Sequence, residues 1–181
     1  PREVPPSGLP DPEDESNLEL DLPLVERALV SFLQDEIVSR REFNDVVVGV
    51  SGGVDSAVAL MLAVRALGAE HVHAFLLPYS TSSPESLRDG RRVLEAAGVT
   101  GRMIEITGAV DAYIDSEERD LPDLRRGNVA ARLRSVILWD QAARLNALPL
   151  GTGNKSERLL GYFTWHADDS PPVNQLGDLF K

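Results

Sequence analysis

Glycine, hydroxyl and carboxylate groups are concentrated in one short stretch of this 181-residue chain, which reads SGGVDS at 51–56. The stretch follows an apolar run at 46–50 and precedes a helical apolar repeat at 57–67, so the sequence predicts a strand, a tight turn and a helix start. The N–H groups of a helix start bind phosphate, and adjacent glycines let the backbone approach it closely. A carboxylate repels bare phosphate, so Asp55 indicates a metal ion between the two.

This loop is not of the Walker type, which places a Lys beside Ser or Thr after a longer glycine-spaced loop. It could instead be a plain turn that packs the strand against the helix. The density of glycine, serine and aspartate at a strand–helix junction favours phosphate binding.

Further segments carry side chains suited to a nucleotide. The hydroxyl-rich stretch LPYSTSS at 77–83 would contact adenine and ribose, or would simply cap the next helix. Arg132 and Arg134, in GNVAARLR at 127–134, suit forked contacts with phosphate, or are ordinary surface charges.

A second glycine-containing turn, GTG at 151–153, follows a short apolar run and is again typical of a loop that faces a nucleotide. Glu157 lies four residues further on, inside a predicted helix with apolar neighbours. It is either a solvated acid or a second carboxylate for a metal ion.

Strand and helix signals alternate along the chain. We expect helices at 23–41, 55–67, 84–97, 110–116, 128–145 and 154–160, and strands at 46–50, 72–77, 102–106 and 148–150. Ser83 and Pro84 are a helix cap and a first helical residue, while Gly68 and Gly98 end helices. The alternation predicts an α/β fold, a doubly wound parallel sheet with flanking helices and a Rossmann-like character. The loop at 51–56 would then lie at the carboxyl end of a strand, where such sheets bind ligands.

Length and composition predict one folded domain. Residues 1–22 form an acidic, Pro-rich segment that we expect to be disordered or loosely docked, and residues 23–181 form the domain. We expect this domain to lack a C-terminal segment, because the sequence around Lys181 does not resemble a domain terminus. No apolar run reaches membrane-spanning length and no signal peptide is visible, so a cytoplasmic enzyme is expected.

Charge and cysteine content restrict the function. The net charge is −11, of which residues 1–21 carry −6, and this acidic balance argues against a nucleic-acid partner. The sequence contains no cysteine. Disulfides, thiolate metal sites and a Cys nucleophile are therefore excluded within these residues, including the Cys with which amidotransferases take nitrogen from glutamine.

The SGGVDS loop resembles the pyrophosphate-binding loop of the N-type ATP pyrophosphatases. Together with LPYSTSSPES, GNVAARLR and GTGNKSERLLGYFT, it makes residues 23–181 resemble the ammonia-dependent NAD synthetases. The resemblance implies a ligase that uses ATP and Mg²⁺ to convert deamido-NAD (nicotinic acid adenine dinucleotide) and ammonia into NAD. An acyl-adenylate is the intermediate, and AMP and pyrophosphate are released.

The resemblance also implies roles for particular residues. The ATP phosphates would be held by Gly49, Ser51, Gly52, Gly53, Asp55 and Ser56. Thr152 and Lys181 would contact ATP, and Asp55 and Glu157 would bind Mg²⁺. Arg132 would bind deamido-NAD. Asp55, Lys181 and Asp168 would be the catalytic groups, with Asp168 positioning or deprotonating ammonia.

The chain departs from this family after GYFT at 161–164. Many members continue with KYGDGG, a small residue and Asp, whereas this chain reads WHADDSPP at 165–172. Asp168 matches the pattern, but Trp165 replaces the Lys and Pro172 replaces the later Asp. Trp165 is therefore a candidate to stack on a pyridine or adenine ring, or is ordinary core.

Two other functions agree with the same residues. One is another ATP pyrophosphatase that adenylates a different acid or a nucleobase, and the other is a degenerate nucleotide-binding module. The resemblance further implies a homodimer and free ammonia, or ammonia supplied by a separate protein. A dimer seam or the domain core would take five apolar residues of the long helix: Val129, Leu133, Val136, Ile137 and Leu145.

Overall fold

The computed structural model describes residues 19–117 and 121–181. Within them, four parallel strands form one sheet in the order β3-β2-β1-β4. The strands are β1 (Asp45–Gly49), β2 (Val72–Leu76), β3 (Arg102–Met103) and β4 (Ala147–Leu150). The predicted doubly wound parallel sheet is confirmed.

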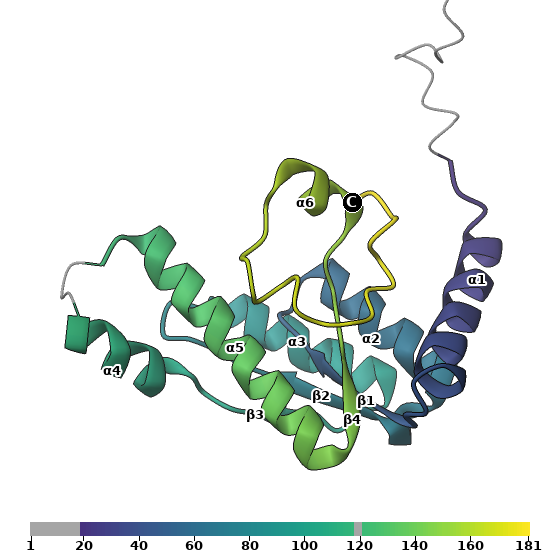
Figure 1. Cartoon of the computed structure of the whole chain (residues 1–181), viewed down its shortest axis with the longest axis horizontal. Helices are drawn as coiled ribbons and strands as arrows, with labels where there is room; N and C mark the ends of the chain where they lie inside the picture. Colours follow the sequence, from purple (N-terminus) through teal and green to yellow (C-terminus); the bar gives the residue numbers. More distant parts are fainter. Residues whose placement is uncertain (1–18, 118–120) are drawn as a thin grey trace, which may run out of the picture.

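Helices cover both faces of the sheet (Figure 1). One face packs against α2 (Val54–Leu67) and α3 (Pro84–Ala97), with α1 (Leu22–Gln34) outside α2. The other face packs against α5 (Asp123–Leu145), with α4 (Thr107–Glu117) beside it.

The alternation of β1 explains this layering. Val46 and Val48 are buried in the cluster that contains α1, α2 and α3, whereas Val47 is buried in the cluster that contains α4 and α5. Successive side chains of a strand point to opposite faces, so one apolar run supplies both cores.

Helix ends agree with the local sequence. The Ser83 hydroxyl accepts a hydrogen bond from the Ser86 N–H at 3.0 Å, and Pro84 is the first residue of α3. Gly98 ends α3 in the left-handed conformation with φ 66°. The first predicted helix ends differently, because α1 continues as a π-helical turn at Asp35–Ser39.

Most strands and helices lie within one or two residues of their predicted limits, and three elements differ by more. Strand β3 has two residues rather than five; Ile104 N and Ile106 N still donate to the carbonyls of Leu76 and Pro78, but Pro78 has no N–H to continue a ladder. Helix α4 begins at 107 rather than 110. Helix α5 begins five residues before 128, directly after Pro122, so Gly127 lies inside it.

The chain beyond β4 lies over the carboxyl ends of the strands. It contains α6 (Lys155–Leu160) and an irregular segment that returns toward the sheet, where Val173 bridges to Leu150 (Figure 1). Residues 1–18 of the predicted tail lie outside the described residues. Across 19–117 and 121–181, no helix is long and apolar enough to cross a membrane.

Candidate active site

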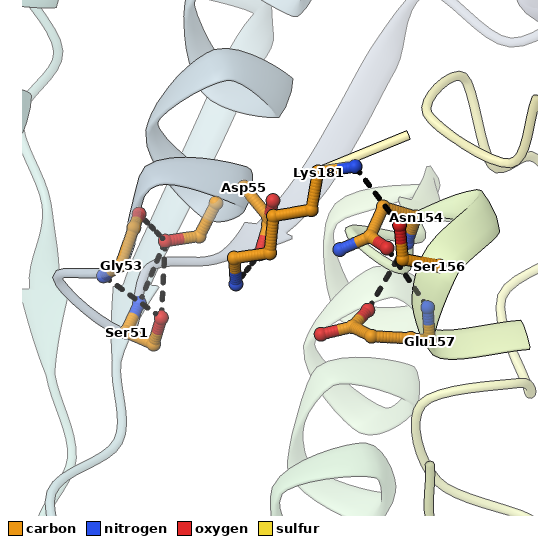
Figure 2. Close-up of polar contacts among 8 residues, drawn as sticks. Ser51, Gly53, Asp55, Asn154, Ser156, Glu157 and Lys181 are labelled. Atoms are coloured by element: carbon orange, nitrogen blue, oxygen red, sulfur yellow. Dashed lines mark hydrogen bonds and ion pairs between the residues drawn. The ribbon is translucent and has the colours of Figure 1, made fainter. Parts of the chain in front are cut away.

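The SGGVDS loop joins β1 to α2 and is held by its own hydroxyl groups (Figure 2). The Ser56 hydroxyl accepts from the Ser51 N–H at 3.2 Å and donates to the Gly53 carbonyl at 3.0 Å. The Ser51 hydroxyl accepts from the Gly53 N–H at 3.2 Å and lies 3.1 Å from the Ser56 hydroxyl. These hydrogen bonds fix the shape of the loop, and α2 begins within it at Val54.

Gly52 is required by both conformation and space. Its φ is 89°, and a Cβ added there would lie 2.1 Å from the Ser86 carbonyl oxygen. The loop thus packs against the first turn of α3. Only glycine combines this φ with so close an approach of two backbones.

Lys181 connects the loop to α6 (Figure 2). Its Nζ donates to Asp55 Oδ2 at 2.8 Å, and its backbone N–H donates to the Ser156 hydroxyl at 3.1 Å. Three predicted site residues come together here, because Glu157 belongs to the same short helix.

Glu157 also caps its own helix. Its Oε2 accepts from the Asn154 N–H at 3.1 Å, while Asn154 Oδ1 accepts from the Glu157 N–H at 2.9 Å. This reciprocal pair is a capping box, and it fixes the carboxylate at the start of α6.

The two carboxylates act on the same cation. The hydrogen bond and charge of Asp55 raise the pKa of Lys181 above its ordinary value, and the charge of Glu157 adds to this. Both carboxylates therefore attract a cation at the position of the Lys181 ammonium. Oxygen donors that converge in this way fit Mg²⁺, which binds through one or two protein carboxylates together with phosphate oxygens.

A cavity of about 400 Å³ opens beside the loop at the carboxyl ends of β1, β2 and β4. Such a volume is in the range of small-molecule sites. Four predicted site residues line it: Gly49, Ser51, Thr152 and Asp168. The remaining predicted residues do not line it, so the Asp55–Lys181–Glu157 group lies outside the cavity wall.

The loop after β2 contributes to the cavity through Ser82. This loop is held by Tyr79, whose hydroxyl donates to Asp111 Oδ1 at 2.8 Å and accepts from Arg126 Nη1 at 3.2 Å. The Ser82 hydroxyl accepts from the Tyr79 N–H at 3.0 Å. The hydroxyl-rich stretch is thus more than a helix cap, because it forms part of the wall.

One face of α5 forms the opposite wall, and the sequence did not single this face out. Ala131, Arg134, Ser135 and Leu138 line the cavity at positions i, i+3, i+4 and i+7. Arg134 Nε donates to the Leu77 carbonyl at 2.9 Å. Burial lowers the pKa of Arg134 and the charge of Asp168 opposes this. The sequence indicated Arg134 but not its neighbours, and residues at helical spacing from Arg134 could have identified this face of α5.

Arg132 and Trp165 lie outside the cavity lining. Arg132 Nε donates to the Trp165 carbonyl at 3.1 Å. The Trp165 side chain is 64% exposed, so it is not core, and its ring lies 5.4 Å from that of Phe163. The two residues predicted to bind the substrate, Arg132 and Trp165, therefore contact each other.

The segment that carries Asp168 is attached to α5. Asp168 Oδ2 accepts from the Thr164 N–H at 2.8 Å, and the Thr164 hydroxyl donates to Asn128 Oδ1 at 3.0 Å. These contacts fasten the first half of the segment at 164–171.

Ser170 fastens the second half. Its hydroxyl lies 2.7 Å from that of Ser135, accepts from Trp139 Nε1 at 3.2 Å and donates to the Ala167 carbonyl at 2.8 Å. Asp168 is therefore placed at the cavity by hydrogen bonds on both sides of it.

Known proteins share this architecture. The family model described as NAD synthase matches residues 25–181. An NH(3)-dependent NAD(+) synthetase of Chlorobium phaeobacteroides is 49% identical over 164 residues, which cover 91% of this chain and 58% of that protein.

Solved structures agree. An NH3-dependent NAD synthetase from Campylobacter jejuni, in complex with the nitrate ion, superposes with a TM-score of 0.84 at 36% identity, covering 90% of this chain and 70% of that one. An NMN synthetase from Francisella tularensis gives a TM-score of 0.83 at 29% identity, covering 90% and 67%. The chain spans about three fifths of the length of the curated relative that it matches.

Proposed function

The chain belongs to the NAD synthase family, whose model matches residues 25–181, and on this premise we propose that it acts in the ATP-dependent amidation of deamido-NAD with ammonia. The reaction is that of a C–N ligase and yields NAD, AMP and pyrophosphate. One observation carries the proposal: loops at the carboxyl ends of β1, β2 and β4 line a single cavity together with Arg134 and Asp168.

Adenylation overcomes the poor reactivity of a carboxylate. An oxygen of the nicotinate carboxylate attacks the α-phosphorus of ATP, and the bond from that phosphorus to the β-phosphate breaks, so pyrophosphate leaves. Ammonia then attacks the carbonyl carbon of the acyl-adenylate. The C–O bond to AMP breaks with its electron pair, the nitrogen loses a proton to a base, and the amide remains.

The residues of the phosphate loop would stabilise the departing pyrophosphate. The backbone of Gly49 to Gly53, the Ser56 hydroxyl and the N-terminus of α2 would bind its oxygens. Thr152 would contact ATP from the end of β4. Lys181, which lies against the loop, would offset phosphate charge.

Mg²⁺ would be held by Asp55 and Glu157, and when bound it would supply positive charge against the phosphate oxygens. Both carboxylates already stabilise one cation, the ammonium of Lys181. The two carboxylates of this chain thus provide the oxygen ligands that such an ion prefers.

Asp168 would position ammonia or accept its proton, because it is the acid of the predicted set that lines the cavity. Arg132 would bind deamido-NAD, and Trp165, whose carbonyl Arg132 contacts, would stack on a ring of the dinucleotide. Nitrogen would come from free ammonia or from a separate ammonia-supplying protein, and the likeness to NH(3)-dependent relatives supports this.

We also infer a homodimer. Val129, Leu133, Ile137 and Leu145 of α5 pack in the domain core, whereas Val136 is 63% exposed. The exposed apolar residues Leu124, Val136 and Trp139 on the same helix would form the contact between subunits.

The test is an assay of the chain with ATP, Mg²⁺ and deamido-NAD, given ammonium or glutamine in parallel. We expect NAD with ammonium and none with glutamine. Asp55→Asn should lower pyrophosphate release about 100-fold or more, because loss of this carboxylate would weaken binding of the Mg²⁺ whose charge stabilises the departing pyrophosphate. Asp178→Asn is the control, since that exposed acid lies in the same C-terminal segment. Full activity of Asp55→Asn would contradict the metal assignment.

A second candidate is the adenylation of a smaller acid. The likeness to an NMN synthetase favours it, as do Trp165 and Pro172, which differ from the family pattern. Pyrophosphate release with the mononucleotide acid but not with deamido-NAD would support this candidate. ATP binding without pyrophosphate release from any acid would instead indicate a degenerate module.

A further inference from the structure

Arg134 presents an incompletely bonded guanidinium to the cavity. Among the residues that the structure describes, its one hydrogen bond runs from Nε to the Leu77 carbonyl. Those residues place no carboxylate within ion-pair distance of it. A guanidinium has five N–H donors, and a half-buried cation is costly unless an anion pairs with it.

The residues that line the cavity with Arg134 indicate which class of ligand would fit there. Leu77, Pro78 and Leu138 line the cavity with apolar surface around it, and Asp168 lines the same cavity. A planar ring would fit between apolar walls, and an anionic group on that ring would meet the free edge of the guanidinium. We propose that Arg134 binds the carboxylate of the acid that is adenylated, and this inference rests on the proposed function.

A carboxylate fits better here than a phosphate. The groups suited to the ATP phosphates are the 51–56 loop and Lys181, and of these only Ser51 lines the cavity. Arg134 stands on the other wall, on α5. Its terminal nitrogens form a fork that matches the two oxygens of a carboxylate.

The contact has a consequence for both steps. Before adenylation, the guanidinium orders the carboxylate and offsets its charge. Afterwards, one former carboxylate oxygen is the carbonyl oxygen of the acyl-adenylate and stays beside the same N–H groups. These donors stabilise the negative charge that this oxygen gains when ammonia attacks, and the charge is lost again as AMP leaves.

The test compares two ligands that differ only at this group. Deamido-NAD carries a carboxylate where NAD carries a neutral carboxamide. In calorimetric titrations, Arg134→Met should weaken binding of deamido-NAD about 10- to 100-fold, the value of a charge-assisted forked pair. Binding of NAD and of AMP should change less than about threefold, which also shows that the variant is folded.

Arg144→Met is the matched control. Arg144 lies on the same helix and also makes a hydrogen bond through Nε, to Gln141 Oε1 at 3.0 Å, but it does not line the cavity. This variant should bind both dinucleotides as the unchanged protein does. Arg134→Lys keeps a positive charge without the fork and should weaken deamido-NAD by an intermediate factor.

Three results would overturn the inference. Equal losses for NAD and deamido-NAD would show that Arg134 acts through Leu77 on the structure. A loss confined to AMP would assign the guanidinium to a phosphate. If the unchanged protein does not bind deamido-NAD, deamido-NAD is not the acid that is adenylated. That result is obtained without any Arg134 variant, so it is distinguishable as a failure of the proposed function. If Arg134→Met does not fold, Arg134→Lys must show the selective loss alone.

Discussion

Two adjacent glycines of the phosphate loop differ in what they require. Gly52 has φ 89° and almost touches the Ser86 carbonyl, whereas Gly53 has φ −83° and has room for a Cβ at ordinary contact distance from the Ser51 hydroxyl. Gly52→Ala should therefore destabilise the fold by about 1–3 kcal/mol and weaken ATP binding. Gly53→Ala should change the free energy of unfolding by less than about 1 kcal/mol. Urea unfolding measures both, and equal effects would contradict the required glycine at 52.

Asp168 and Asp169 provide a second adjacent pair. Both side chains are exposed, but Asp168 lines the cavity and its carboxylate accepts from the Thr164 N–H, whereas Asp169 does not line the cavity. Asp168→Asn keeps the acceptor oxygen but loses the charge. It should lower kcat about 100-fold, a value typical of general-base catalysis, with little change in ATP affinity.

The readout is NAD formation at varied ammonium concentration. Asp169→Asn is the control and should keep the kinetics of the unchanged protein. If both variants lose activity equally, Asp168 acts by shaping the segment rather than on ammonia.

For single residues, the sequence predicts which side chains belong to the site better than it predicts where those side chains point. Gly52, Asp55 and Thr152 are placed by local motifs, and the structure has them at the strand ends where the motifs predict. Arg132 and Arg134 are equivalent in the local sequence, yet Arg134 lines the cavity whereas Arg132 does not and contacts the Trp165 carbonyl. Their direction depends on which face of α5 meets the sheet, and this is decided by packing of residues far apart in the chain.

Among the elements, local signals succeed where a cap or an apolar run defines the end. Ser83, Pro84 and Gly98 delimit α3 as predicted. The start of α5 was misplaced because Gly127 resembles a boundary, while Pro122 is the residue that precedes the helix. Tertiary packing against β1 and β4 stabilises this long helix despite its internal glycine.

The segment at 164–171 depends on α5 for its position, and this can be measured. Ser135 is 8% exposed and lies 2.7 Å from Ser170 through their hydroxyl groups. Ser170→Ala should destabilise the protein by about 1–3 kcal/mol, because Trp139 Nε1 and Ser135 then lose a partner. In a double-mutant cycle with Ser135→Ala, the two losses should overlap by about 1 kcal/mol.

Urea unfolding gives the energies, and hydrogen exchange of 164–171 shows whether the segment opens locally. Ser116→Ala is the control, because among the described residues the Ser116 hydroxyl donates within its own helix, to the Tyr113 carbonyl at 2.7 Å. Additive losses for the two α5-facing serines would contradict a shared contact.

For the whole molecule, the net charge is unfavourable for the binding of anions. The net charge is −11, yet the proposed substrates, ATP and deamido-NAD, are anions. Attraction must therefore come from Lys181 and Arg134, which act over short distances, and not from the overall field. The overall composition therefore argues against a nucleic-acid partner but does not indicate where the site lies.

Exposed apolar residues of α5 support a prediction about assembly. Val136 is 63% exposed although it lies on a helix that otherwise packs on the sheet, and Trp139 on the same helix is 43% exposed. A charge in the centre of a subunit contact is strongly unfavourable once desolvated. Val136→Asp should therefore convert a dimer into a monomer in analytical ultracentrifugation, while the thermal unfolding of each subunit remains cooperative.

Leu159→Asp is the matched control, because Leu159 on α6 is apolar and 69% exposed but lies away from α5. It should leave the sedimentation coefficient unchanged. If the unchanged chain sediments as a monomer, or if both variants dissociate it equally, the α5 contact is wrong.

Because Trp139 and Ser135 of the same helix line the cavity, loss of the dimer should also weaken binding of deamido-NAD. Ultracentrifugation and titration on one preparation of Val136→Asp would show whether assembly and substrate binding are coupled through α5.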